Sequence, residues 1–423
     1  MTSLRRQILS EGGWVLAGYA ANTAASLVGL RLLTSYLAPE VYGTVSLLLG
    51  VLMLSQHVFI APFQQAAFRF YSEVQQRHDL PRLRRVVVRY LQRAASALLA
   101  LLLAGGLAFS AWKGTAYVCF LMLGAILLVQ VMRSFEHTLF WAARRQRPIA
   151  LFQAADAWAK PLLAIAAVIA FGASPQAVLS GHLVAEISGL AVLLAFVPRE
   201  GRGPAEPPGP EDAELARGIR SYAWPVAPMA IANWISNLSD RYIIGALIGP
   251  AGVGLYAASY GLVSQPFISA QAVTGGTLSP VYFSAVSAND GALARKAFRS
   301  WFLGTLALCA AGVVGVLLLR DWIAWMFLAE QYRGGSPLMP WIAVGYAIAA
   351  LNQPLTLRLQ AHMRTVEVML SHGAGAVASI ALTLPLVWRF GIAGAAVACP
   401  CYFAVVFAAL AWFGRRSATP AGQ

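Results

Sequence analysis

Long apolar stretches, separated by short segments with charge, proline or glycine, recur along the whole chain. A helix needs about 20 mostly apolar residues to cross a hydrocarbon core of about 30 Å. The pattern predicts an all-α polytopic membrane protein of about twelve transmembrane helices. The predicted spans are residues 13–37, 42–66, 91–112, 115–140, 149–171, 176–197, 221–247, 253–284, 297–319, 337–357, 366–388 and 391–413.

The composition agrees with a membrane protein and excludes a soluble one. Hydrophobic residues make up 59% of the 423 positions and charged residues only 11%, whereas about 25% of a soluble domain is charged. Twelve spans leave only short loops between them. We therefore expect no soluble domain of useful size.

The net charge of +14 has two possible explanations, a nucleic-acid-binding surface or membrane topology. With the N-terminus placed in the cytoplasm, predicted cytoplasmic segments hold 23 of the 31 Lys and Arg residues and predicted outer segments hold 4. This alternation follows the rule that Lys and Arg are enriched on the cytoplasmic side. We expect cytoplasmic N- and C-termini, a first span that is not a cleaved leader, and no nucleic-acid partner.

A polar, proline-rich segment at residues 198–217 divides the predicted spans into two sets of six. The expected organisation is an N-terminal six-helix lobe (1–197), a flexible cytoplasmic linker (198–217) and a C-terminal six-helix lobe (218–423). A weak internal repeat supports two related halves. Residues 31–43 and 241–256 each combine an arginine, a proline-containing turn and a Gly/Tyr entry into the next span.

Several kinds of site are missing from the sequence. It has no G-x-x-x-x-G-K-[ST] phosphate loop, no Asp-x-Asp pair and no metal-ligand spacing of His and Cys. We expect no cofactor, no metal and no enzymatic activity. The four cysteines lie in apolar stretches and are interpreted as small core residues: Cys119, Cys309, Cys399 and Cys401.

Four short stretches resemble the Wzx-type O-antigen and exopolysaccharide flippases of the multidrug/oligosaccharidyl-lipid/polysaccharide exporter superfamily. They are Arg31–Gly43, Ala67–Tyr71, Asn237–Tyr242 and Glu330–Tyr332. The resemblance implies two six-helix lobes around a central cavity that opens alternately to each side of a bacterial inner membrane. It implies an undecaprenyl-pyrophosphate-linked glycan as cargo, with membrane lipid and other polysaccharide assembly proteins as further partners.

Other functions stay open. A lipid II flippase or a cation-coupled drug exporter of the same superfamily would have the same hydropathy. A membrane glycan polymerase would need a sizeable polar outer loop, and the longest outer segment, Arg320–Ser336, is mostly apolar and aromatic. Its aromatic residues predict that this segment lies along the outer surface.

Ionisable residues inside predicted spans are the candidate site, because a charge at the centre of a spanning helix costs about 2.5–3.5 kcal/mol and usually faces a cavity or a partner. Arg31 and Arg241 occupy related positions near the outer ends of their spans. Arginine donates bidentately to phosphate oxygens, so both are candidate pyrophosphate ligands. Alternatively, both extend to the outer headgroups, with Asp240 neutralising Arg241.

The N-terminal half carries the other candidates. Lys160 and Arg133 are possible cavity cations, although Asp156 has the i,i+4 spacing of an ion pair with Lys160 and Glu136 shares a helix face with Arg133.

Glu186 is interpreted as the most isolated acid of the chain. Its suggested role, shared with Asp156 and Asp240, is coupling transport to an ion gradient. The alternative is that Glu186 is hydrogen-bonded by Ser or Gln side chains of adjacent helices.

Overall fold

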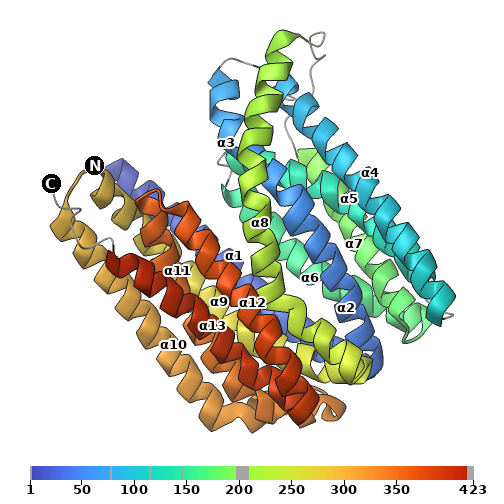
Figure 1. Cartoon of the computed structure of the whole chain (residues 1–423). Helices are drawn as coiled ribbons and strands as arrows, with labels where there is room; N and C mark the ends of the chain where they lie inside the picture. Colours follow the sequence, from blue (N-terminus) through green and yellow to red (C-terminus); the bar gives the residue numbers. More distant parts are fainter. Residues whose placement is uncertain (1, 77–78, 114–116, 144–145, 197–208, 417–423) are drawn as a thin grey trace. The chain divides into compact units, whose positions relative to one another are not determined.

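The computed structural model describes residues 2–76, 79–113, 117–143, 146–196 and 209–416. Nearly all of these residues are helical and none of them lies in a β-strand (Figure 1). In chain order the helices are α1 (Thr2–Tyr36), α2 (Pro39–Ser55), η1 (Gln56–Ile60), α3 (Ala61–Gln76), α4 (Leu80–Lys113), α5 (Tyr117–Ala142), α6 (Gln146–Phe171), α7 (Pro175–Phe196), α8 (Pro210–Leu247), α9 (Pro250–Ser287), α10 (Gly291–Phe327), η3 (Glu330–Leu338), α11 (Met339–Ala361), α12 (Thr365–Phe390) and α13 (Ile392–Arg416).

The prediction of an all-α polytopic membrane fold is confirmed. α2 continues into α3 through the π-helical turn η1. Among the described residues, nine helices are long and apolar enough to cross a membrane. α1, α8 and α9 are not among these nine; the second half of α9, for example, is rich in Gly, Ser, Thr and Gln.

The predicted linker at 198–217 coincides only partly with the described residues. Residues 197–208 lie outside them, and Pro210 begins α8. Proline suits the first turn of a helix because the amide hydrogen that it lacks would have no intrahelical partner there. The division of the chain into lobes at this linker stays a prediction.

The chain forms two compact units, which we call unit 1 and unit 2. Unit 1 comprises Met1–Ala25 and Leu48–Ile231, and unit 2 comprises Ser26–Leu47 and Ala232–Gln423. In unit 1, α7 packs against α5 and α6, while α3 and α4 pack against α5. In unit 2, α9 packs against α10 and α11, and α10 also packs against α11. At the C-terminal end, α13 packs against α11 and α12.

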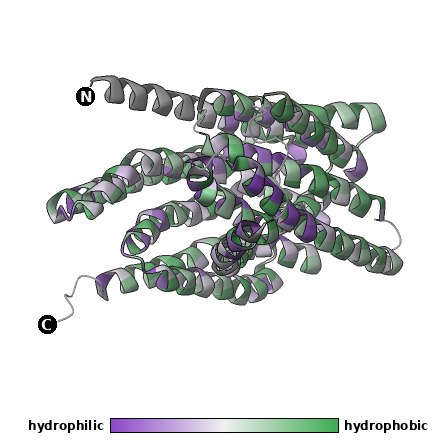
Figure 2. Cartoon of the chain, turned by 90° about the horizontal axis from the view of Figure 1, so that it is seen from above, coloured by the Kyte–Doolittle hydropathy of each residue, from purple (hydrophilic) through white to green (hydrophobic). Residues whose placement is uncertain are grey.

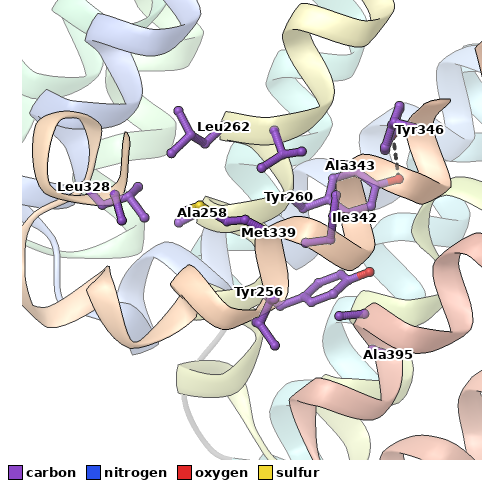
Figure 3. Close-up of a cluster of buried hydrophobic side chains, with 14 of the residues drawn as sticks. Tyr256, Ala258, Tyr260, Leu262, Leu328, Met339, Ile342, Ala343, Tyr346 and Ala395 are labelled. Atoms are coloured by element: carbon purple, nitrogen blue, oxygen red, sulfur yellow. Dashed lines mark hydrogen bonds between the residues drawn. The ribbon is translucent and has the colours of Figure 1, made fainter. Parts of the chain in front are cut away.

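Each unit has its own apolar core. Leu83, Leu123 and Phe135 are fully buried in the core of unit 1. The core of unit 2 includes Tyr256 and Met339, both fully buried (Figure 3).

Apolar side chains also cover the outside of the helices. Figure 2 shows hydrophobic residues along most of the helical length. Phe171, Leu318 and Trp388 are 77%, 77% and 82% exposed. Exposed apolar surface of this extent indicates contact with lipid or another apolar partner.

Two expectations about particular residues are wrong. Cys401 is exposed, although the other three cysteines are buried as expected. Tyr332 is fully buried, whereas Trp322 and Trp325 are more than half exposed. The segment Arg320–Ser336 therefore does not present all of its aromatic rings at a surface, because Tyr332 lies in η3 and packs into the core of unit 2.

Candidate functional site

Four charged side chains from three helices of unit 1 form one cluster, which we call the charge ring. Arg133 of α5 donates from Nη1 to Glu186 of α7 (2.5 Å) and from Nη2 to Asp156 of α6 (2.6 Å). The Nζ atom of Lys160 lies 3.3 Å from Asp156 Oδ2 and 3.2 Å from Glu186 Oε1. Each cation thus contacts both carboxylates, and the formal charges cancel.

The members of the charge ring differ in accessibility. The side chain of Glu186 is 1% exposed and that of Arg133 is 11% exposed, while Asp156 reaches 14% and Lys160 reaches 30%. Lys160 and Asp156 are therefore the members that a solute would meet first.

The local sequence explains how Arg133 fits among three packed helices. A Cβ atom on Gly189 of α7 would lie 3.1 Å from the Nε atom of Arg133, so glycine provides the room for the guanidinium group. Phe152 of α6 places its ring centroid 5.5 Å from the guanidinium carbon, a distance at which a cation is attracted to an aromatic face.

A pocket of about 260 Å³ adjoins the charge ring. Besides the ring itself, polar and aromatic side chains line it: Gln130, Ser134, His137, Phe152 and Gln153. The Oδ1 atom of Asp156 and the Oε1 atom of Gln130 are buried without a hydrogen-bond partner in the described part of the chain. Buried acceptors without donors are costly, so a proton, a cation or a ligand donor would stabilise this pocket.

The structure corrects two interpretations of these charges. Glu186 is not isolated, because α7 packs against both α5 and α6 and brings it to Arg133 and Lys160. Glu136 does not pair with Arg133 but with Arg84 of α4. The expected ion pair between Asp156 and Lys160 is confirmed.

The candidates Asp240 and Arg241 lie together on α8 in unit 2. Asp240 is 1% exposed and accepts a hydrogen bond from the hydroxyl of Tyr256 (2.5 Å). Arg241 donates from Nη1 to Ser46 Oγ (3.1 Å) and lies 5.0 Å from the ring centroid of Tyr260. No carboxylate of the described residues lies within ion-pair distance of the guanidinium, and its Nε is buried without a partner.

Tyrosine hydroxyl groups extend this polar network through the core of unit 2. Tyr346 donates to the hydroxyl of Tyr260 (2.7 Å), which in turn donates to the carbonyl oxygen of Asn237 (3.2 Å) (Figure 3). The ring that lies over Arg241 is thereby fixed in orientation. Arg241 keeps at least one unused donor, its buried Nε atom.

Arg31 has a different environment within unit 2. Its Nη1 atom donates to the carbonyl oxygen of Leu328. Nearby, Gln331 donates to the carbonyl oxygens of Thr34 (3.1 Å) and Leu37 (2.9 Å), and Tyr332 also donates to Leu37 (2.9 Å). These carbonyls belong to the end of α1, where helical partners run out. We call this set of bonds the α1 clamp.

The α1 clamp and Gly189 were not singled out in the sequence. Gln331 and Tyr332 fall in a stretch noted for its resemblance and its aromatic residues, and their partners are almost 300 positions away. Gly189 is one glycine among 37. Neither has a local signal, because each depends on which helices become neighbours.

The described residues contain no group of three or more His, Cys, Asp and Glu side chains that could hold a metal ion.

Comparisons with known proteins agree with the fold. A family model described as "Polysaccharide biosynthesis protein" matches residues 6–286. No curated protein matches the chain.

Several solved membrane transporters are similar in structure. The lipid II flippase MurJ in an inward closed conformation has a TM-score of 0.73 at 11% identity, covering 95% of this chain and 87% of that chain. An inward-facing multidrug resistance MATE family transporter of the MOP superfamily has a TM-score of 0.69 at 12% identity, covering 93% and 94%. A MOP superfamily transporter from Pyrococcus furiosus has a TM-score of 0.65 at 12% identity, covering 97% and 95%. At these identities the similarity concerns the fold.

Proposed function

Because the chain belongs to the polysaccharide biosynthesis protein family, we propose that it flips an undecaprenyl-pyrophosphate-linked oligosaccharide from the cytoplasmic to the periplasmic leaflet of a bacterial inner membrane. The cargo would supply O-antigen, capsule or exopolysaccharide synthesis. The chain is a multi-pass membrane protein with a transporter fold. The orientation with both termini in the cytoplasm and the alternating access of two lobes around a central cavity are parts of the proposal.

The observation that carries the proposal is the charge ring. Two cations and two carboxylates lie in contact between apolar helices, next to a polar pocket of about 260 Å³. Charges inside spanning helices are costly and typically mark a substrate or ion pathway. A pyrophosphate group needs such a polar path, since it cannot enter hydrocarbon unaccompanied.

In this mechanism the two carboxylates pair with the two cations until protons neutralise the carboxylates and the cargo takes their place beside the cations. Protonation of Asp156 and Glu186 would leave Arg133 and Lys160 unbalanced, and a pyrophosphate diester would then neutralise them. Arginine offers a planar fork to two phosphate oxygens, and lysine adds a point charge. Release of the protons would restore the ring and expel the anion, so cargo and protons would move together and translocation would depend on the proton concentration on each side of the membrane.

The unit 2 candidates have supporting roles in the proposal. Arg241 is suited to bind a phosphate oxygen because its Nε atom has no hydrogen-bond partner among the described residues. Asp240 would titrate beside it. Arg31 would join them only when its bond to Leu328 opens.

The similarity in fold to a lipid II flippase and to a MATE transporter keeps two alternative cargoes in view. A lipid II flippase would carry a related pyrophosphate lipid, and a drug exporter would carry an organic cation. Arg241, whose Nε atom is buried without a hydrogen-bond partner among the described residues, favours an anionic cargo.

A deletion experiment in the native host separates these functions. Loss of the protein is expected to abolish surface polysaccharide and to trap lipid-linked oligosaccharide on the inner leaflet. Wild-type protein and the exposed-site variant Arg217→Gln should restore the polysaccharide, whereas Lys160→Gln should not. Normal surface glycan together with raised drug sensitivity would contradict the proposal and indicate a drug exporter.

A further inference from the structure

A second polar pocket, separate from the charge ring, lies within unit 2 where α9 ends, α10 begins and α11 ends. Its volume is about 540 Å³. Its charged and titratable lining residues are Asp290, Arg295, Arg358 and His362. We call it the basic pocket.

The two arginines of the basic pocket are available to a ligand. Arg295 comes from the first turns of α10 and Arg358 from the last turn of α11. Neither has an ion pair or a hydrogen bond through its side chain among the described residues. The pocket therefore carries a positive charge that the protein itself leaves unbalanced.

The acid in the basic pocket is already engaged. Asp290 caps α10, and its Oδ1 atom accepts hydrogen bonds from the amides of Ala292 (3.1 Å) and Leu293 (2.9 Å). An aspartate in this position stabilises the helix start. Its Oδ1 atom is therefore occupied by the helix start, and one carboxylate against two arginines leaves the basic pocket with a net positive charge.

Aromatic packing fixes the orientation of Arg358. Its guanidinium carbon lies 5.1 Å from the ring centroid of Phe298, and the Tyr282 ring lies 6.0 Å from that of Phe298 between centroids. A guanidinium held by its face against a ring presents its N–H edge outward. The Tyr282 hydroxyl, which has no hydrogen-bond partner among the described residues, is a further donor at the same pocket.

The position of the basic pocket points to a lipid ligand. The distribution of Lys and Arg predicts that Arg295 and Arg358 lie on the cytoplasmic side of the membrane. Basic pockets between transmembrane helices on that side are suited to acidic lipid headgroups. The volume also falls in the range of small-molecule sites.

We propose that the basic pocket binds the phosphate group of a lipid in the cytoplasmic leaflet, through Arg295, Arg358 and the Tyr282 hydroxyl. Both an acidic phospholipid and a phosphorylated polyprenol carry this chemistry. The proposal does not depend on the cargo proposed above.

The test uses the full-length protein in a neutral detergent, with bound lipid followed by native mass spectrometry. Cardiolipin, undecaprenyl phosphate and phosphatidylcholine are titrated separately, and inorganic pyrophosphate serves as the lipid-free anion. The test variant is Arg295→Gln/Arg358→Gln. The matched control is Arg217→Gln/Arg220→Gln, which removes the same charge from exposed positions of α8.

The test variant is expected to weaken cardiolipin or undecaprenyl phosphate binding by about 10- to 30-fold relative to phosphatidylcholine. The control should change binding by less than about 2-fold. A loss for cardiolipin alone identifies a phospholipid site, and a loss for undecaprenyl phosphate alone identifies a carrier-lipid site; either supports the proposal. Equal effects of the two double variants, or an effect on pyrophosphate only, would overturn it.

Tyr282→Phe gives a second readout that leaves the net charge unchanged. This variant should weaken the same lipid by a few-fold, because one donor is lost. Wild-type lipid affinity in Tyr282→Phe would show that the hydroxyl does not contribute to binding. Wild-type affinity in both this variant and the arginine variant would overturn the proposal as a whole.

Discussion

Gly43 at the start of α2 approaches Pro250 at the start of α9 so closely that a Cβ atom on Gly43 would lie 1.9 Å from the carbonyl oxygen of Pro250. The reverse relationship also holds, since a Cβ atom on Gly254 would lie 2.0 Å from the carbonyl oxygen of Pro39. The two prolines and the two glycines are the equivalent residues of the internal repeat. A reciprocal contact of this kind is what a two-fold relation between the repeated segments would produce.

Replacing either glycine of this crossing by alanine should destabilise the protein. The added methyl group would meet backbone, which cannot move aside as a side chain can, and overpacking of this kind costs about 1–3 kcal/mol or more. Thermal unfolding of purified Gly43→Ala and Gly254→Ala should show lower midpoints than wild type. Gly261→Ala on α9 is the control, because nothing lies within 4 Å of its added Cβ. Equal thermal midpoints for all four proteins would show that the two glycines have room for a methyl group, which contradicts the close backbone contact.

The α1 clamp predicts a smaller loss of stability. Tyr332→Phe removes one hydrogen bond to Leu37 and keeps the buried ring, so it should cost about 0.5–1.5 kcal/mol. Gln331→Leu should cost more, because it removes the donor to two carbonyl oxygens. Thermal midpoints in detergent check the order. A larger effect of Tyr332→Phe than of Gln331→Leu would contradict the assignment of the carbonyl partners.

The charge ring predicts a rescue between two substitutions. Glu186→Gln leaves Arg133 and Lys160 facing a single carboxylate, and breaking a buried pair from one side costs about 3–5 kcal/mol. The double variant Lys160→Gln/Glu186→Gln keeps the neutral pair of Arg133 and Asp156. It should therefore recover much of the lost folding yield and thermal stability. A double variant less stable than Glu186→Gln would contradict the ring geometry.

Gly189 offers a way to disturb Arg133 without changing any charge. A Cβ atom at this position would lie 3.1 Å from Arg133 Nε, so Gly189→Ala should displace the guanidinium by a few tenths of an ångström. Transport should fall several-fold with little change in expression, because misplacement of a binding group lowers rates strongly. Gly105→Ala, with open space around its Cβ, is the control. Wild-type transport in Gly189→Ala would argue against a role for Arg133 in cargo handling.

The sequence was sufficient to predict the fold class and one pair within the candidate site. Hydropathy predicts spanning helices because a bilayer requires them, and the i,i+4 spacing predicts the contact of Asp156 with Lys160 because one helix fixes it. The partners of Glu186 and Arg133 could not be predicted in this way. They follow from the packing of α7 against α5 and α6, and no local pattern specifies that packing.

The sequence shows which polar residues lie inside predicted spans, but it does not show which groups these residues bond to. Arg31 could be placed near the end of its helix, yet its bond to the carbonyl oxygen of Leu328 spans almost 300 positions. Arg241 beside Asp240 suggested an ion pair, whereas Asp240 instead accepts from Tyr256 and the guanidinium lies over Tyr260. Adjacent residues on a helix point in different directions, so the two side chains have different hydrogen-bond partners although they lie next to each other in the sequence.

Translocation of a lipid-linked oligosaccharide by purified protein in liposomes tests the central claim most directly. The comparison is between wild type and Asp156→Asn/Lys160→Gln, a double variant that removes one cation and one carboxylate and keeps the charge ring neutral. We predict that wild type moves the lipid between leaflets and that the folded double variant moves it about 10- to 100-fold more slowly, the cost of one lost charged contact. Equal rates for the two proteins, or no movement by wild type, would contradict the account.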